Sequence, residues 1–204
     1  MGKIDPRVVK TKRKLKEAFL ILVGKQTLKE INVKDLTNLA DVTRGTFYLH
    51  YKDKETFIQT MMSECLSDFF ESIMINTAKE GEPAVYVCSL LNIFDYVEKR
   101  PDFFMTLLKE EDAIPYRLQM KDSFYKYIDD FVKNSQNSRN EKIPEKLLMN
   151  FFTYAFLGYL QGWINDGMMY ANHFMAKNLY KLMNSQFIEE AGIAGFFVIV
   201  NPVV

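Results

Sequence analysis

The stretch from Val33 to Lys54 constrains the fold more than any other part of the chain, because it predicts two short helices around a tight turn. Apolar side chains recur at helical spacing between residues 33 and 40. Asn32 precedes them and Asp35 follows three residues later, which is a variant of the reciprocal cap that starts helices. Thr43 is a suitable N-cap for the second helix. A connection this short is typical of a helix-turn-helix.

The second of these helices predicts a division between buried and outward side chains. Phe47 and Tyr51 are four residues apart and are expected to face inward, together with Ala40 and Val42. The side chains left for the outward side can bind bases or phosphates in a major groove: Arg44, Thr46, Tyr48 and His50. Gly45 would let the helix approach a duplex closely, although glycine inside a helix costs about 1 kcal/mol relative to alanine. The alternative is a small helical knot with no nucleic-acid partner.

The sequence ADVTRGTFYLHYKDKE, residues 40–55, resembles the DNA-binding signature of the TetR family of bacterial transcription regulators. The match covers about residues 9–58. The resemblance implies that Lys34 and Lys54 hold phosphates, while Leu49 stands where the family varies and has an apolar base contact open to it. It also implies that the groove-facing residues are Thr43, Arg44, Gly45, Thr46, Tyr48 and His50.

The distribution of charge agrees with a DNA-binding head. The chain has no net charge, but residues 1–54 hold 13 Lys and Arg against 6 Asp and Glu. The remainder holds 13 against 20, so the two parts carry +7 and −7. A basic head on an acidic body confines the attraction for DNA to one end. Lysines crowd the start of the first predicted helix, where they oppose the helix dipole. Phosphate contacts would offset that cost, and a solvated charged face is the alternative.

Helical spacing continues through the rest of the chain, and strand-like alternation is scarce. The predicted fold is therefore all-α, with a three-helix head and a C-terminal helical bundle for ligand binding and dimerisation. We expect a DNA-binding domain over residues 1–53, a regulatory and dimerisation domain over 54–190, and an apolar tail over 191–204. A polar loop is expected over 134–140. The helices are predicted at about 8–24, 33–40, 44–50, 53 to 75 or 79, 84–99, from 101, 116–133, 145–166 and 171–189.

The last two predicted helices are more apolar than the body of a small monomer needs. Packed in pairs across a two-fold axis, they would form a four-helix interface, and Gly158 and Gly162 would permit close approach there. The alternative is that both helices form the monomer core. The stretch FLGYLQGWINDGM, residues 156–168, resembles the regulatory domain of TetR-type proteins of Firmicutes. That resemblance implies a ligand pocket in the body, to which no residue can be assigned.

The tail from Gly192, GIAGFFVIVNPVV, is apolar and β-prone but too short to span a bilayer. It could pack on the body, pack on the dimer seam, or be foreign or frameshifted sequence. Cys65 and Cys88 lack CxxC spacing and are expected to be buried, reduced thiols, as in a cytoplasmic protein. No signal peptide is expected, because the basic N-terminal stretch has no apolar segment of sufficient length.

The sequence contains no recognisable catalytic motif. There is no His, Cys and carboxylate cluster with metal-ligand spacing, no phosphate-binding glycine loop and no nucleophile elbow. We therefore expect no enzyme, no cofactor and no metal. The predicted function is a homodimeric, ligand-responsive transcriptional repressor of a pseudo-palindromic operator in double-stranded DNA, with a small-molecule effector and no membrane partner. The alternative is a coactivator or protein-interaction module that a partner protein controls.

Overall fold

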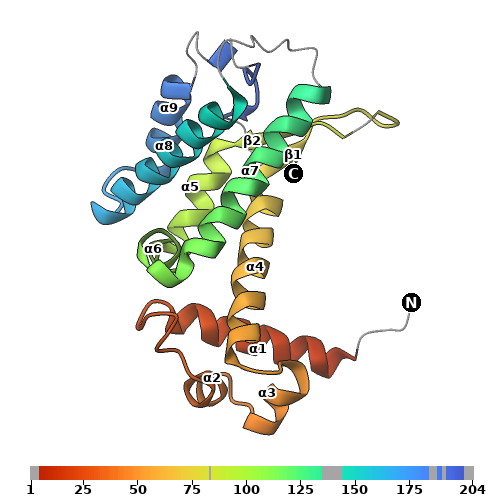
Figure 1. The fold of residues 1–204 in the computed structure, drawn as a ribbon, viewed down its shortest axis with the longest axis vertical. Helices are drawn as coiled ribbons and strands as arrows, with labels where there is room; N and C mark the ends of the chain where they lie inside the picture. The colour runs from red at the N-terminus through yellow and green to blue at the C-terminus, as the bar shows by residue number, and fades with distance from the viewer. Residues whose placement is uncertain (1–4, 83, 135–143, 184–187, 190–191, 200–204) are drawn as a thin grey trace. The chain divides into compact units, whose positions relative to one another are not determined.

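The computed structural model describes residues 5–82, 84–134, 144–183, 188–189 and 192–199. The predicted helical class is confirmed, and a small sheet accompanies the helices. Figure 1 shows the elements in chain order. They are α1 (Pro6–Leu22), α2 (Val33–Leu39), α3 (Arg44–His50), α4 (Lys54–Ile73), β1 (Met74–Asn76), β2 (Tyr86–Ser89), α5 (Leu90–Glu98), α6 (Pro101–Lys109), the 3-10 turn η1 (Glu111–Ala113), α7 (Ile114–Asn134), α8 (Glu145–Asn165), α9 (Asn172–Met183) and β3 (Phe197–Val198).

The chain divides into two compact units, which we call unit 1 and unit 2. Unit 1 consists of residues 1–66 and 102–116, and unit 2 consists of residues 67–101 and 117–204. The division falls within α4, so each unit is described separately. The domains expected over residues 1–53 and 54–190 were defined by function, not by compactness, and they stay a prediction.

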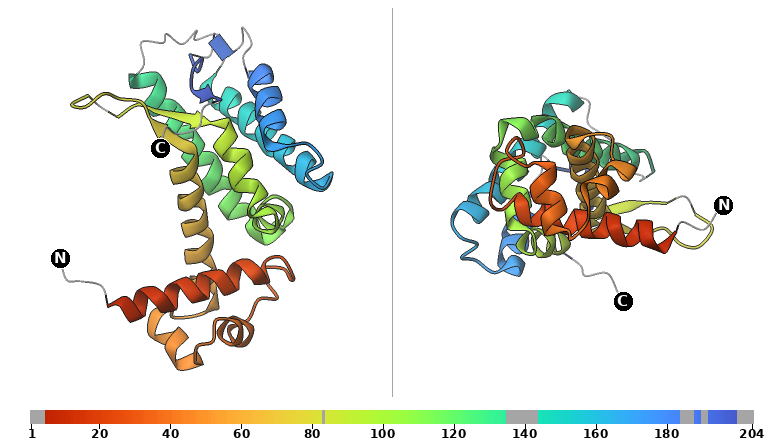
Figure 2. Two further views of the ribbon diagram at one scale, coloured as in Figure 1. Left: turned by 180° about the vertical axis from the view of Figure 1, so that it is seen from behind. Right: turned by 90° about the horizontal axis from the view of Figure 1, so that it is seen from below.

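Unit 1 is built around aromatic side chains from three helices. Phe57 of α4 lies 6.0 Å from Phe19 of α1 and 5.3 Å from Phe47 of α3, measured between ring centroids. All three rings are fully buried. In sequence order α1 packs against α2, and α2 against α3, as Figure 2 shows. The start of α1 lies two residues before the predicted one, because Asp5 accepts a hydrogen bond from the Arg7 amide and Pro6 occupies the first turn.

The segment from Asp102 to Tyr116 also belongs to unit 1, where it holds the connection between α1 and α2. The buried Thr106 hydroxyl donates to the Val23 carbonyl at 3.1 Å. The Leu28 amide donates to the Glu110 carboxylate at 3.0 Å. A Cβ atom at Gly24 would lie 2.4 Å from a carboxylate oxygen of Asp102. A larger residue at position 24 would therefore force the exposed Asp102 side chain to move.

Unit 2 has a second aromatic core, formed by α5, α7 and α8 with the last turns of α4. The ring of Phe124 lies 5.3 Å from Phe156 and 6.4 Å from Phe69. Phe94 lies 5.2 Å from Trp163, whose indole nitrogen donates to the Tyr170 carbonyl at 2.8 Å. The helix α5 also packs against α9. Gly167 follows α8 with φ of +70°, so the predicted helix stop is confirmed.

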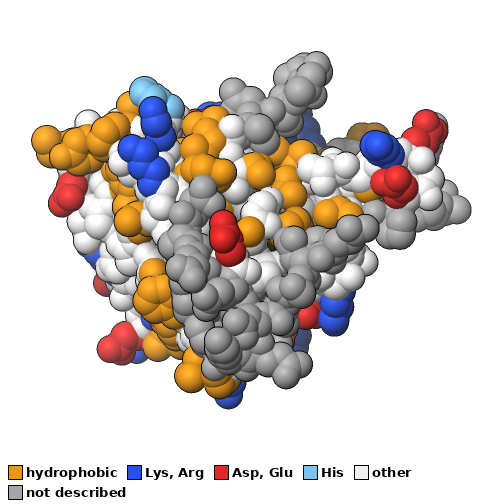
Figure 3. Space-filling model, turned by 90° about the horizontal axis from the view of Figure 1, so that it is seen from above, with side chains coloured by type: hydrophobic (Ala, Val, Ile, Leu, Met, Phe, Trp, Pro, Cys, Tyr) orange, Lys and Arg blue, Asp and Glu red, His pale blue; other side chains and the backbone are white. Residues whose placement is uncertain are grey.

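A three-stranded sheet lies where the sequence predicted the end of one helix and the start of the next. The strand β1 pairs with β2 in antiparallel register, Met74 with Cys88 and Asn76 with Tyr86. The prediction that α4 continues to residue 75 or 79 is therefore wrong, as is the prediction of a helix from residue 84. Ser89 caps α5 instead, because its hydroxyl accepts from the Asn92 amide at 3.2 Å. The exposed connection between the strands carries charged side chains and projects at the right of Figure 3.

The third strand comes from the apolar tail. The strand β3 pairs with β2 in parallel, and the Cys88 amide donates to the Phe196 carbonyl at 2.7 Å. Phe196 is fully buried, 5.4 Å from the ring of Phe131. Residues 192–199 thus pack on the body, which was one of the alternatives left by the sequence. Residues 135–140 of the predicted loop, and residues 184–187 of the last predicted helix, lie outside the described residues.

None of the helices in the described ranges is long and apolar enough to cross a membrane.

Candidate nucleic-acid interface

The first helix of the candidate motif starts at the predicted cap. The Asn32 side-chain oxygen accepts from the Asp35 amide at 3.0 Å, and its amide nitrogen donates to the Asp35 carboxylate at 2.7 Å. The buried Thr37 hydroxyl donates to the Val33 carbonyl one turn earlier, at 2.8 Å. Asp35 and Thr37 are therefore satisfied locally, and the apolar side of α2 packs on α1.

The turn after α2 has an unusual backbone conformation at Asp41. Its φ is +52°, in the left-handed region that Asp and Asn tolerate better than most residues. Lys14 of α1 donates to the Asp41 carboxylate at 3.1 Å. The Val42 amide donates to the Thr37 carbonyl at 3.0 Å, which closes the turn. These contacts fix the angle at which the chain enters α3.

The helix α3 begins and packs as the sequence predicted. The Thr43 hydroxyl accepts from the Thr46 amide at 3.1 Å, which confirms the predicted N-cap. Phe47 is fully buried and Tyr51 is 5% exposed, with their ring centroids 5.5 Å apart. Two side chains one turn apart thus attach α3 to the core of unit 1.

The outward side of α3 differs in part from the expected set. Arg44, Gly45 and Tyr48 are exposed, as predicted. Thr46 and His50 are half-buried, and the Thr46 hydroxyl shares a hydrogen bond of 2.9 Å with the Thr43 hydroxyl. The expected set took every second residue, whereas residues of a helix turn by about 100° each, so alternate residues do not share a face.

The two predicted phosphate-binding lysines have different surroundings. Lys34 is exposed on α2. The Lys54 ammonium donates to the Lys29 carbonyl at 2.9 Å and lies 3.9 Å from the Glu55 carboxylate. Only 25% of the Lys54 side chain is exposed. An ammonium group has three protons, so Lys54 can bind a phosphate while it keeps these contacts.

The start of α4 is capped by a carboxylate. Asp53 accepts a hydrogen bond of 2.7 Å from the Thr56 amide. Hydrogen bonds to Thr56 hold the pKa of Asp53 below its usual value, so this carboxyl group stays ionised at neutral pH. Its negative charge stands beside Lys54 in the chain and weakens the attraction of this helix start for a phosphate.

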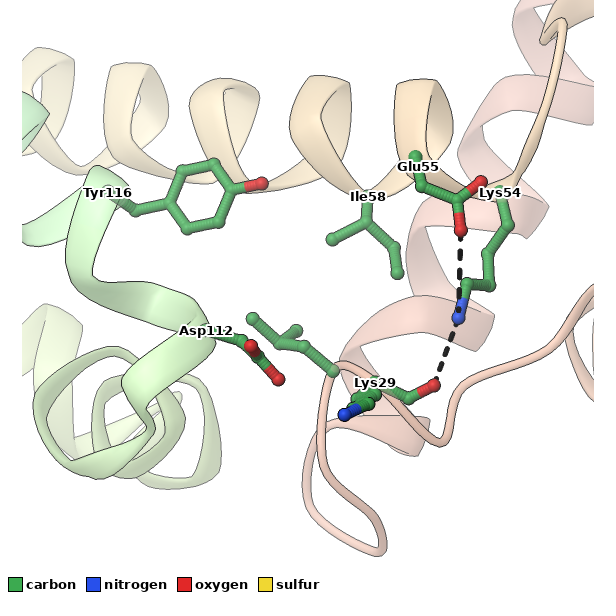
Figure 4. A pocket seen from close by; sticks show the side chains of 7 residues that line it. Lys29, Lys54, Glu55, Ile58, Asp112 and Tyr116 are labelled. Atoms are coloured by element: carbon green, nitrogen blue, oxygen red, sulfur yellow. Dashed lines mark hydrogen bonds and ion pairs between the residues drawn. The ribbon is translucent and has the colours of Figure 1, made fainter.

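A surface groove of about 290 Å³ adjoins Lys54 within unit 1. Figure 4 shows its wall of side chains from α4, η1, the start of α7 and the connection between α1 and α2. Burial raises the pKa of one of them, Tyr116. The two lysines and two carboxylates neutralise one another, so the groove has no net charge with which to hold a phosphate. The lining residues are Leu28, Lys29, Lys54, Glu55, Ile58, Asp112 and Tyr116.

Both cysteines are free and buried, as the sequence predicted. Burial raises the pKa of the Cys88 thiol, which keeps it protonated. In the part of the chain that the structure describes, no group of three or more His, Cys, Asp and Glu side chains could hold a metal ion.

The C-terminal half of the chain matches a known protein family. Residues 86–185 match the TetR family model described as "Transcriptional regulator C-terminal region". The chain is similar to the HTH-type transcriptional regulator YxbF of Bacillus subtilis, with 24% identity over 188 residues. That similarity covers 89% of this chain and 46% of the relative, so the chain spans about half the relative's length.

Solved structures share the fold. A TetR transcriptional regulator from Streptococcus agalactiae superposes with a TM-score of 0.61 at 22% identity, covering 89% of this chain and 97% of that one. The fatty acid degradation regulator FadR from Bacillus halodurans gives 0.64 at 11% identity, covering 91% and 98%. This family consists of transcription regulators, which confirms the expectation that the chain is not an enzyme. With the capped helix pair of unit 1 and the matched C-terminal region, the chain is a member of the TetR family of transcriptional regulators.

Proposed function

We propose that the protein is a cytoplasmic repressor that binds a pseudo-palindromic operator as a homodimer and is released by a small-molecule effector. The observation that carries the proposal is the construction of α3. Its start is fixed by the Thr43 cap, its inner side is held by Phe47 and Tyr51, and its opposite side is exposed. A short, rigidly held helix with a free outer side suits insertion into a major groove.

The proposed contacts divide into base-reading and positioning groups. Arg44 is exposed and can donate two hydrogen bonds to one guanine. Gly45 lets the helix backbone approach the base edges, and Lys34 and Lys54 hold phosphates. We assign groove contacts to Thr43, Arg44, Gly45, Thr46, Tyr48 and His50. Two such helices in a dimer would enter successive major grooves about 34 Å apart.

The dimer is supported by an apolar surface on α8 that is exposed among the described residues. Leu147, Phe151 and Tyr154 follow one another at helical spacing and are each about 60% exposed. Cβ atoms built at Gly158 and Gly162, farther along the same helix, would meet no atom within 4 Å. Figure 3 shows hydrophobic side chains at the surface on the side of unit 2 where α8 and α9 lie.

The helix α9 adds to this surface. Phe174 is 47% exposed and Leu182 is 68% exposed, while Met175 and Leu179 on the other side are buried. One side of each helix thus serves the core and the other side is left for a partner. Exposed apolar surface on two neighbouring helices supports a four-helix interface between two copies of the chain.

The proposed response to an effector is a population shift. A ligand that binds better to a conformation with wrongly spaced heads lowers the affinity for the operator, because the two equilibria are linked. The helix α4 supports such coupling, because its residues belong to both compact units. The segment from Asp102 to Tyr116 supports it too, since its hydrogen bonds hold the connection between α1 and α2.

The test begins with selection of bound fragments from random and genomic duplex DNA at several salt concentrations. Enrichment of one inverted repeat, with affinity that falls steeply with salt, is the expected result. Retention of DNA without a common sequence, or no retention at low salt, would contradict the proposal and favour the protein-interaction module.

The selected operator then tests the reading residue. Arg44→Ala should weaken operator binding by about 1–3 kcal/mol and relax the base preference at one position in each half-site. Lys126→Ala is the matched control, because it removes an exposed positive charge from α7 in unit 2. Unchanged affinity and base preference in Arg44→Ala, measured by fluorescence anisotropy, would show that α3 is wrongly placed as the reading helix.

A further inference from the structure

The most exposed large hydrophobic side chain in the described residues lies on α3. Leu49 is 82% exposed, whereas Phe47 and Tyr51 on the inner side of this helix are buried. A single exposed leucine is common on protein surfaces and means little by itself. What gives Leu49 significance is its position on the helix.

The angular position of Leu49 follows from helix geometry. Each residue of an α-helix turns by about 100°, so Leu49 lies about 180° around the axis from the midpoint of Phe47 and Tyr51. Those two side chains define the direction of the core. Leu49 therefore marks the centre of the outer side of α3, whereas Thr46 and His50 are half-buried on its flank.

The surface around Leu49 is open and apolar. Gly45 precedes Leu49 by four residues, so both lie on the same side of α3, about one turn apart. A Cβ atom at Gly45 would meet only the Thr43 hydroxyl, at 3.7 Å. The outer side of α3 therefore presents the exposed Leu49 side chain and, one turn earlier, a residue without a side chain.

We propose that Leu49 reads the 5-methyl group of a thymine in each operator half-site. The inference rests on the proposed function, in which α3 enters the major groove. The thymine methyl is the one apolar group that the four ordinary bases present there. Leu49 has no hydrogen-bonding group and can discriminate bases only by such a contact. The structure therefore assigns thymine specificity to Leu49 and hydrogen-bonded specificity to Arg44.

The test removes the methyl group and nothing else. In the selected operator, each symmetric pair of thymines is replaced by deoxyuridine, and the affinity of the full-length protein is measured by fluorescence anisotropy at constant salt. Replacement at one symmetric pair should weaken binding by about three- to fivefold for each methyl lost. This is the change in affinity expected when one buried methyl-sized group is removed. All other pairs should have smaller effects.

Variants of the protein connect that effect to Leu49. In Leu49→Ala the loss caused by deoxyuridine at that pair should disappear, and selection from random DNA should no longer enrich thymine there. Leu49→Ala should fold normally, because the side chain packs on little. Leu39→Ala is the matched control, since Leu39 is a 43% exposed leucine of α2, and this variant should keep the full effect.

The results separate this inference from the proposed function. A protein that selects an operator and loses affinity in Arg44→Ala, but binds every deoxyuridine operator as well as the parent, would retain its function and overturn the role of Leu49. Equal sensitivity to deoxyuridine in Leu49→Ala and the parent protein would overturn it as well. Failure to select any operator would instead contradict the proposed function itself.

Discussion

Among single residues, Tyr51 combines a buried ring with a polar group that the fold does not satisfy. Its side chain lies in the core of unit 1, 4.8 Å from the ring of Phe57. In the described structure its hydroxyl is buried without a hydrogen-bond partner. Burial, with a smaller contribution from the negative charge of Glu64, raises the pKa of Tyr51 to about 12. The folded state therefore strongly favours the neutral phenol.

We predict that Tyr51→Phe stabilises the protein by about 1 kcal/mol at neutral pH, because it removes an unsatisfied buried hydroxyl and keeps the ring. The advantage should grow above about pH 10. There the unfolded phenol ionises while the folded one stays neutral until about pH 12, so the parent loses stability as the pH rises. Urea unfolding of both proteins at about pH 7 and pH 11 measures the difference.

The matched control is Tyr48→Phe, because Tyr48 is a tyrosine of the same helix that is 53% exposed. It should change stability little at either pH, and it should affect operator binding where Tyr51→Phe does not. A Tyr51→Phe variant less stable than the parent would mean that a water or another group satisfies the hydroxyl.

Residue-level features were predictable where the chemistry is local. The caps at Asn32 and Thr43 depend on residues three positions apart, and both are confirmed. The exposure of Thr46 and His50 was predicted less well, because it depends on the direction in which α3 meets the core. Lys54 was expected to be available for phosphate, and its contact with the Lys29 carbonyl arises from a segment 25 residues away.

Whole elements, like single residues, were predictable where the signals that form them are local. Helices with their own caps and apolar spacing were predicted, whereas β1 and β2 were not, and for β3 only the β-prone character of the tail was noted. Each strand is only two to four residues long and gains its hydrogen bonds from another part of the chain. The strand β2 requires β1 on one side and β3, more than 100 residues later, on the other. Short-range periodicity holds no information about such pairing.

The role of the tail in this sheet leads to a prediction. We expect Phe196→Ala to destabilise the protein by about 3–5 kcal/mol, because it leaves a cavity between β3 and Phe131. Ile199→Ala is the control, since Ile199 is 37% exposed in the same segment and should cost far less. Thermal or urea unfolding of both variants measures the difference. Equal, small effects would show that the tail adds nothing to the core.

At the scale of the whole molecule, the proposed dimer and the monomer make opposite demands on Gly158. In the described part of one chain a Cβ atom at this position would meet no atom within 4 Å, so glycine only weakens α8 there. Replacing it by leucine should stabilise the helix by about 0.8–1 kcal/mol. In a close four-helix interface the same side chain would collide with the partner helix and cost about 1–3 kcal/mol.

We therefore predict that Gly158→Leu raises the dimer dissociation constant at least fivefold, measured by sedimentation equilibrium, and yet stabilises the monomer. Because the stability of a dimer depends on protein concentration, the unfolding midpoints of variant and parent should cross. The variant should be more stable in dilute solution and less stable in concentrated solution. Gly158→Ala should keep most of the gain in the monomer with a smaller loss of dimer. If Gly158→Leu were more stable at every concentration and dimerised normally, the interface would have to lie elsewhere than on this side of α8.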